Sequence, residues 1–297
     1  MADKALLKQL LERQDYIAKY LRKNYINPYL EGELLEFNLK PKKDLHTDKI
    51  MWQFWGQGVD ESTHPVVKSS FFSVGLNKGD YERIILNNNT IRDYIDLPDF
   101  VYEKLKTNKN YNYAFFSDVL RVSLLSAYGG VWLDATILLT DKIPSEILDS
   151  DFFAYQRGKR PDNFDILENQ FLYYWCWDKN FKVNLLNSFI VAKKNHKIIN
   201  ALKNILLNYW LYEDCMLDYF LFQILFDELM KIDEFKQLNC DIVSDYIPHR
   251  MQYFRNSEYS NELWNFIVSE CSIHKLSYYN CSPDSIFGHA ISLYNPV

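Results

Sequence analysis

Apolar side chains recur at helical spacing along four long segments of the chain. In residues 4–23 they include Leu10, Ile17 and Leu21, which would share one face of a helix. Residues 112–128, 196–211 and 216–231 show the same periodicity, so each of these segments is expected to be helical. Shorter helical pieces are predicted at residues 69–74, 90–95 and 100–106.

Short apolar runs between these segments predict strands. In chain order they are residues 49–55, 81–86, 131–133, 138–140, 152–155 and 188–192. Gly129-Gly130 separates one predicted helix from the strand that follows, as expected where a helix end needs a left-handed residue. The alternation of strands and helices predicts an α/β fold with a central, mostly parallel sheet flanked by helices.

The beginning of the chain departs from this alternation. Asn27-Pro28 and the polar run 40–44 interrupt the hydrophobic pattern. We therefore interpret residues 1–45 as an N-terminal helical extension and residues 46–297 as the main domain. The extension is locally basic, and two interpretations stay open: its helix packs on the domain, or it contacts an anionic membrane surface.

Composition narrows the class of protein. The 297 residues include 33 Lys plus Arg and 39 Asp plus Glu, which gives a formal charge of −6 and argues against a nucleic-acid binder held by bulk charge. The five cysteines show no C-x-x-C spacing, no leader is visible and no apolar run approaches 18 residues. The sequence thus predicts a cytoplasmic protein with reduced cysteines, placed at most peripherally on the inner face of the membrane.

Two segments carry polar residues in apolar surroundings. Asp118 and Arg121 lie three residues apart on a predicted helix that is otherwise nearly all apolar. They form either an internal ion pair or a polar face turned toward a cleft. Asp134 follows an apolar strand, where the crevice of an α/β sheet binds ligands, although a turn or helix-cap role is equally open.

These segments together resemble the capsular-polysaccharide-synthesis branch of the family 32 glycosyltransferases, the sugar-binding DXD group. The matching runs are KIMWQFWGQG (49–58), YAFFSDVLRVSLLSAYGGVWLDAT (113–136), NSFIVAKK (187–194) and IHKLS (273–277). The chain is more distantly similar to the large clostridial glucosylating toxins. The resemblance implies a GT-A-like, Rossmann-like fold and a UDP-sugar-dependent, usually retaining transferase.

The same resemblance implies roles for the first matching runs. Trp55 would stack on the uracil, with Gln53 and Gly56 beside the nucleotide, although Trp55 also suits a core position. Asp118 and Arg121 would hold the donor sugar and its phosphates, and a guanidinium fork suits a pyrophosphate.

A divalent cation is expected at the DXD position, but the sequence departs from that motif. Thr136 stands where the second acid is usual. Asp134 would bind Mn²⁺ or Mg²⁺, or only ribose, in which case Arg121 and Lys275 carry the phosphate charge. His274 is a further candidate metal ligand with a structural alternative.

The remaining candidates are placed around the donor hexose. Asn187 would sit beneath the anomeric carbon, with Ser188 next to it. Asp218 would bind hexose hydroxyls or, alternatively, act as an acid in the first turn of a helix. Gln156 is a weaker candidate for the same pocket.

The expected function is a retaining hexosyltransferase that moves galactose or glucose from UDP-galactose or UDP-glucose. Its acceptor would be a saccharide, lipid-linked at the membrane, in capsule or surface polysaccharide synthesis. The missing second acid leaves open a non-catalytic sugar-nucleotide-binding or scaffold protein of the same fold. No nucleic-acid partner is expected.

Overall fold

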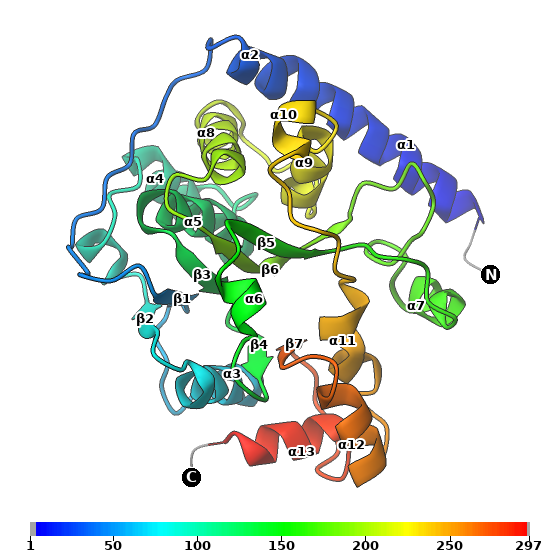
Figure 1. The fold of residues 1–297 in the computed structure, drawn as a ribbon. Helices are drawn as coiled ribbons and strands as arrows, with labels where there is room; N and C mark the ends of the chain where they lie inside the picture. The colour runs from blue at the N-terminus through cyan, green and yellow to red at the C-terminus, as the bar shows by residue number, and fades with distance from the viewer. Residues whose placement is uncertain (1–3, 296–297) are drawn as a thin grey trace.

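The centre of the molecule is a five-stranded sheet with the strand order β2-β1-β3-β6-β5, seen in a computed structural model that describes residues 4–295 (Figure 1). Its strands are β1 (Ile50–Phe54), β2 (Glu82–Leu86), β3 (Gly130–Leu133), β5 (Phe152–Gln156) and β6 (Leu185–Ala192). β1 is parallel to β2 and β3, β6 is antiparallel to β3, and β5 is antiparallel to β6. All strands except β6 therefore run in one direction, which confirms the predicted α/β fold and mostly parallel sheet.

Helices surround this sheet, and a second, two-stranded sheet pairs β4 (Ile137–Leu139) with β7 (Ile273–Lys275). In Figure 1, α5, α8 and α9 lie on one side of the large sheet, while α11 to α13 gather near the small one. The helices are α1 (Lys4–Leu21), a π-helical turn (Arg22–Ile26), α2 (Asn27–Leu30), α3 (Pro65–Asn77), a 3-10 turn (Ile91–Asp93), α4 (Asp99–Thr107), α5 (Tyr113–Tyr128), α6 (Ser145–Leu148), α7 (Phe164–Phe171), α8 (Lys197–Tyr212), α9 (Leu221–Leu229), α10 (Asp233–Lys236), α11 (Tyr246–Tyr253), α12 (Asn261–Val268) and α13 (Ile286–Leu293).

Several predicted helix boundaries were wrong: the helix predicted at 69–74 is the longer α3, and the piece predicted at 90–95 is only a 3-10 turn. Pro28 does not end the first helical region, because it occupies the first turn of α2, where its missing N–H is not needed. The helix predicted at 216–231 begins only at Leu221, since Asp218 accepts a hydrogen bond from the backbone N–H of Phe220 in a turn. Helices α7, α11, α12 and α13 were not predicted from the hydrophobic pattern.

The junction between α5 and β3 positions much of the cavity described below. Asn112 caps α5 by accepting hydrogen bonds from two backbone N–H groups, and Gly129 ends the helix with a φ of 77°. Gly130 has a φ of 99°, and a Cβ there would lie 2.5 Å from the backbone oxygen of Ile50. Glycine at this point lets the first residues of β1 and β3 approach closely, directly after the end of α5.

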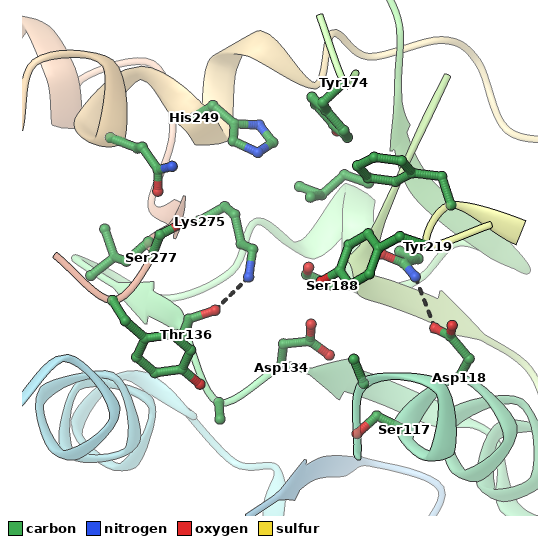
Figure 2. A pocket seen from close by; sticks show the side chains of 18 of the residues that line it. Ser117, Asp118, Asp134, Thr136, Tyr174, Ser188, Tyr219, His249, Lys275 and Ser277 are labelled. Atoms are coloured by element: carbon green, nitrogen blue, oxygen red, sulfur yellow. Dashed lines mark hydrogen bonds between the residues drawn. The ribbon is translucent and has the colours of Figure 1, made fainter. Parts of the chain in front are cut away.

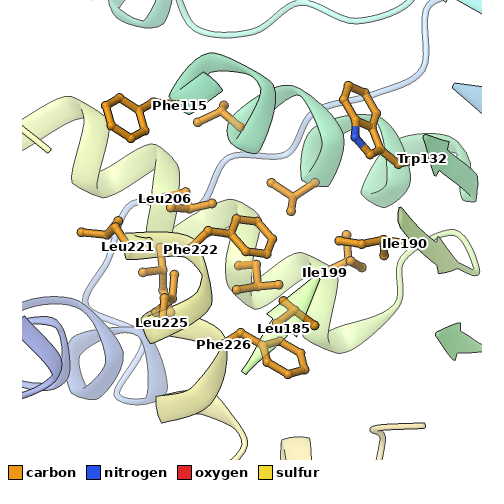
Figure 3. Close-up of a cluster of buried hydrophobic side chains, with 14 of the residues drawn as sticks. Phe115, Trp132, Leu185, Ile190, Ile199, Leu206, Leu221, Phe222, Leu225 and Phe226 are labelled. Carbon is orange, nitrogen blue, oxygen red and sulfur yellow. The ribbon is translucent and has the colours of Figure 1, made fainter. Parts of the chain in front are cut away.

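The largest hydrophobic core joins the sheet to α1, α5, α8 and α9. Phe115, Trp132 and Phe222 contribute aromatic rings to it (Figure 3). Leu10 and Ile17 of α1 are buried in the same core. The packing interpretation of the N-terminal helix is therefore confirmed, because its apolar face is covered by the body of the protein.

Ion pairs reinforce this packing of α1. Arg13 Nε lies 2.8 Å from Asp218 Oδ2, and Arg22 Nη2 lies 2.6 Å from Glu228 Oε2 on α9. The opposite face of α1 keeps basic side chains in solvent, among them Lys8 and Lys19. Across residues 4–295, none of the helices has the length and apolar character needed to cross a bilayer.

His274 is a completely buried imidazole in β7. Its Nε2 lies 2.9 Å from Thr140 Oγ1, and its Nδ1 has no hydrogen-bond partner among the described residues. Burial lowers the pKa of His274 from 6.5 to about 3. The folded protein therefore keeps this ring neutral over a range in which the unfolded chain would bind a proton.

We expect acid to destabilise the protein through His274. Below pH 6.5 the His274 ring binds a proton in the unfolded chain but not in the folded one, so the contribution of His274 to the free energy of unfolding should fall by about 2 kcal/mol between pH ~7.5 and ~5. Urea titrations at both pH values measure this difference, and His274→Asn should reduce it. The matched control is His46→Asn, at an exposed site. An equal pH dependence in both variants would contradict the assignment.

Candidate functional site

A cavity of about 760 Å³ opens beyond the carboxyl ends of β1 and β3 (Figure 2). The segments that follow these strands form one wall together with α5, whereas β7, α7, α11 and the turn before α9 close the other sides. Figure 2 shows Asp118 and Asp134 across the cavity from His249 and Tyr174, with Lys275 and Thr136 at one side.

Arg121 connects α5 to the end of β3 at this cavity. Its Nη1 lies 2.8 Å from Asp118 Oδ1, and its Nη2 donates a 2.9 Å hydrogen bond to Asp134 Oδ1. Asp134 Oδ1 also accepts a hydrogen bond from Trp132 Nε1 at 2.6 Å. The three charged residues predicted to converge thus share one hollow, and both of the earlier interpretations hold: they form an ion-pair network that also lines a cavity.

Arg121 and Asp118 are both buried, which changes the pKa of the Asp118 carboxyl group. Arg121 is only 3% exposed and Asp118 only 6%. Burial and, to a lesser extent, the Asp134 carboxylate together raise the pKa of Asp118 to about 7, against the opposing effects of Arg121 and of the hydrogen bond from Asn187. Nε of Arg121 has no hydrogen-bond acceptor among the described residues, so the guanidinium retains one unused donor beside its two contacts with carboxylates.

An aromatic side chain stands at the end of β1. Trp55 is half-buried, packs beside the cluster of Val67, Phe71 and Ala135, and lines the cavity. Its ring centroid lies 6.3 Å from that of Tyr278. Gly56 also lines the cavity, and a Cβ there would lie 2.8 Å from the ring of Tyr113. This region offers flat aromatic surface to a planar ligand.

A lysine contacts Thr136, the residue that stands where the DXD motif has its second acid. Lys275 Nζ donates a hydrogen bond to Thr136 Oγ1, and both residues line the cavity. Burial lowers the pKa of Lys275, whereas the Asp134 carboxylate opposes this change. The pairing of β4 with β7 brings Lys275 close to Thr136, because Lys275 lies opposite Ile137, the next residue in the chain.

The described residues contain no group of three His, Cys, Asp or Glu side chains that could hold a metal ion. Mg²⁺ in nucleotide enzymes is commonly bound by one or two carboxylates together with phosphate oxygens. Asp134 fits that arrangement as a single protein ligand, because its hydrogen bonds with Arg121 and Trp132 both use Oδ1.

Asn187 is brought to the cavity as predicted by its position in β6. Its Nδ2 donates a 2.9 Å hydrogen bond to Asp118 Oδ1, and Ser188, which Figure 2 labels, lines the cavity beside it. Both residues lie on the strand that pairs with β3. Asp118 is therefore oriented from two elements, by Arg121 on its own helix and by Asn187 on the sheet.

The structure places four other candidates away from the cavity lining. Gln53 is fully buried within β1, and His274 is fully buried in β7, because their strand positions turn them into the protein interior. Asp218 pairs with Arg13 of α1 instead of facing the cavity. Gln156 exchanges hydrogen bonds with Asn239.

Several cavity residues were missed by sequence reasoning. Tyr174 and Trp175 lie in the aromatic run 171–177, which is visible in the sequence but has no helical or strand periodicity. His249 and Gln252 lie on α11, which was not predicted. Of these residues, only those in the aromatic run could have been found from the sequence, because so many aromatic residues lie together outside any predicted helix or strand.

Comparisons with known proteins bear on this site. A solved structure titled PaToxG Glycosyltransferase is similar to this chain at 16% sequence identity and a TM-score of 0.30, with 69% of this chain and 79% of that chain covered. The curated protein sequences gave no match. The model of the family described as capsular polysaccharide synthesis protein matches residues 3–290. Since that match spans nearly the whole sequence, this chain belongs to the capsular polysaccharide synthesis protein family.

Proposed function

We propose that the protein is a glycosyltransferase of capsular polysaccharide synthesis that uses a UDP-hexose as donor. The observation that carries this proposal is the meeting of Trp55, Arg121 and Lys275 on one cavity. An aromatic platform and two cations are the groups that a nucleoside diphosphate requires. The family membership supplies the biological setting.

The donor is oriented by the network around Arg121. The uracil stacks on Trp55, and the diphosphate lies between Arg121 and Lys275. Asp118 and Asn187 are hydrogen bonded to each other and face the region next to the diphosphate, so they receive hydroxyl groups of the hexose. We place galactose or glucose here because these residues offer both an acceptor and a donor to ring hydroxyls.

The reaction breaks the bond between the anomeric carbon and the diphosphate oxygen and forms a bond from that carbon to an acceptor hydroxyl oxygen. Negative charge grows on the departing UDP, and Arg121 and Lys275 stabilise it. In a retaining, front-face route the departing phosphate oxygen takes the proton of the acceptor hydroxyl. Such a route needs no protein nucleophile, in contrast to retaining hydrolases.

A divalent cation is proposed as a partner of the diphosphate. Asp134 would hold Mn²⁺ or Mg²⁺ together with phosphate oxygens, and the cation would add positive charge at the leaving group. Lys275 already provides one charge beside Thr136.

The acceptor is proposed to be a lipid-linked saccharide at the inner membrane surface. The exposed side of α1 carries lysines paired with acids of the same helix, Lys8 with Glu12 and Lys19 with Asp15, so the proposal of a membrane position does not rest on this helix.

The proposal is tested first by donor binding and turnover. A thermal-shift panel of UDP-galactose, UDP-glucose, UDP-N-acetylglucosamine and GDP-mannose, each with Mn²⁺, should raise the melting temperature most for one of the two UDP-hexoses. That donor should also release UDP slowly without an acceptor. Binding without UDP release would favour the non-catalytic alternative, and no shift with any UDP-sugar would contradict the proposal.

Replacement of Arg121 should impair turnover strongly. Arg121→Ala removes the donor fork at the diphosphate, and we expect UDP release to fall by more than ~100-fold. Because this change also leaves Asp118 and Asp134 unpaired, Arg121→Lys serves as a second variant that keeps the charge but loses the fork. Arg92→Ala, which breaks an exposed ion pair with Asp99, is the matched control. Near-normal turnover in both Arg121 variants would refute the role.

Trp55→Ala should weaken binding of UDP itself. Loss of one stacked base typically costs a factor of about 10 or more in affinity, measurable by titration calorimetry with UDP. The control is Trp264→Ala, because Trp264 packs on His289 outside the cavity. If the two variants bind UDP equally well, Trp55 is not the nucleobase platform.

A further inference from the structure

The cavity continues past the charged network into a region walled by aromatic rings. Tyr174 lies between two elements, with its ring centroid 5.9 Å from Phe220 and 5.2 Å from His249. Trp175 meets the His249 ring edge to face at 5.0 Å. Phe171 of α7 approaches Phe220 at 6.3 Å. All five side chains line the same cavity as Asp118 and Arg121.

This aromatic region presents hydrogen-bond acceptors. Gln223 is only 6% exposed, lines the cavity and has no hydrogen-bond partner for its Oε1 among the described residues. Gln223 follows Phe220 by three residues at the start of α9, so both lie on one face. Gln252 of α11 also lines the cavity, and its buried Oε1 is likewise without a partner in residues 4–295.

His249 adds a third acceptor. Its Nδ1 lies 2.7 Å from the backbone oxygen of Asp245, which can only accept, so Nδ1 carries the proton and Nε2 has a free lone pair. Burial lowers the pKa of His249 to about 4 against the opposing charge of Asp245, while Lys275 and Arg157 act in the same direction as burial. The ring is therefore neutral near pH 7.

Aromatic faces combined with unpaired acceptors call for a ligand that has an apolar face and several hydroxyl donors. A pyranose ring has both features, and its hydroxyl oxygens can in turn accept from the amide N–H groups of Gln223 and Gln252. We propose that this end of the cavity is the acceptor subsite, which binds a pyranose on the aromatic wall and receives one of its hydroxyl groups at His249 Nε2. This inference rests on the proposed function, because only a glycosyltransferase would use the bound pyranose as an acceptor.

The subsite is tested by direct saccharide binding. The probes are methyl α- and β-glucopyranoside and methyl α- and β-galactopyranoside, observed by saturation-transfer difference NMR on the full chain with saturating UDP. At least one glycoside should bind the unaltered protein. His249→Phe keeps the ring packing but removes the acceptor, so we expect affinity to fall about 10-fold or more, on the scale of one lost hydrogen bond.

Two further variants sharpen the result. Gln252→Met preserves side-chain length without the amide and should also weaken glycoside binding. His289→Phe is the matched control, because His289 stacks on Tyr259 at 3.9 Å outside the cavity lining, and it should bind the glycoside normally. UDP affinity, measured by calorimetry, should be unchanged in His249→Phe.

Competition then separates this subsite from the donor hexose. A non-hydrolysable phosphonate analogue of UDP-glucose or UDP-galactose should leave glycoside binding intact. Displacement of the glycoside by the analogue, absence of glycoside binding, or equal affinity in His249→Phe and the unaltered protein would each overturn the inference. Glycoside binding that His249→Phe weakens, in a protein that binds no UDP-sugar, would instead uphold a saccharide site while the donor proposal fails.

Discussion

The contact of Arg121 with two carboxylates determines the geometry of the whole cavity. It joins Asp118, on the same helix, to Asp134 at the end of β3, and Asn187 of β6 holds Asp118 from the other side. A buried guanidinium without such partners would be costly, so Asp118 and Asp134 stabilise the folded protein by compensating the charge of Arg121. The close approach of β1 and β3 at Gly130 keeps these elements in place.

The charge balance of this network suits an anionic ligand. Asp118, Asp134, Arg121 and Lys275 sum to zero when all four are ionised. Because burial raises the pKa of Asp118 to about 7, a fraction of the molecules near neutral pH carries a protonated Asp118 and an excess positive charge. An arriving diphosphate would find this excess charge next to Arg121 Nε, which has no hydrogen-bond acceptor among the described residues. Farther along the cavity, the polar side chains of Gln223, His249 and Gln252 are neutral near pH 7.

The local sequence was sufficient to predict the part of the site whose residues lie close together in the chain. Asp118, Arg121 and Asp134 belong to one helix, a glycine turn and one strand, and their convergence was predicted correctly. Lys275 came from resemblance alone, because its meeting with Thr136 depends on a strand pair formed by segments far apart in sequence. Gln53 and His274 face the interior, since the side of a strand that points to a cavity depends on which helices cover it.

The tertiary packing of α11 and of the aromatic run 171–177 had no equivalent in the periodic pattern. His249 and Gln252 become cavity residues only because α11 packs against β7. Neither the spacing nor the type of these residues distinguishes them from ordinary surface positions. This half of the cavity could be recognised only from the assembled fold, through unpaired polar atoms next to rings.

Helix α1 contacts a turn that forms part of the cavity wall. Arg13 binds both the carboxylate of Asp218 and the backbone oxygen of Leu217, in the turn that carries Tyr219 and Phe220 into the cavity wall. A shortened protein that started near residue 46 would lose this tether and expose the apolar groups that cover Leu10 and Ile17. Helix α1 therefore stabilises one wall of the cavity. We expect its removal to disturb that wall as well as the hydrophobic core.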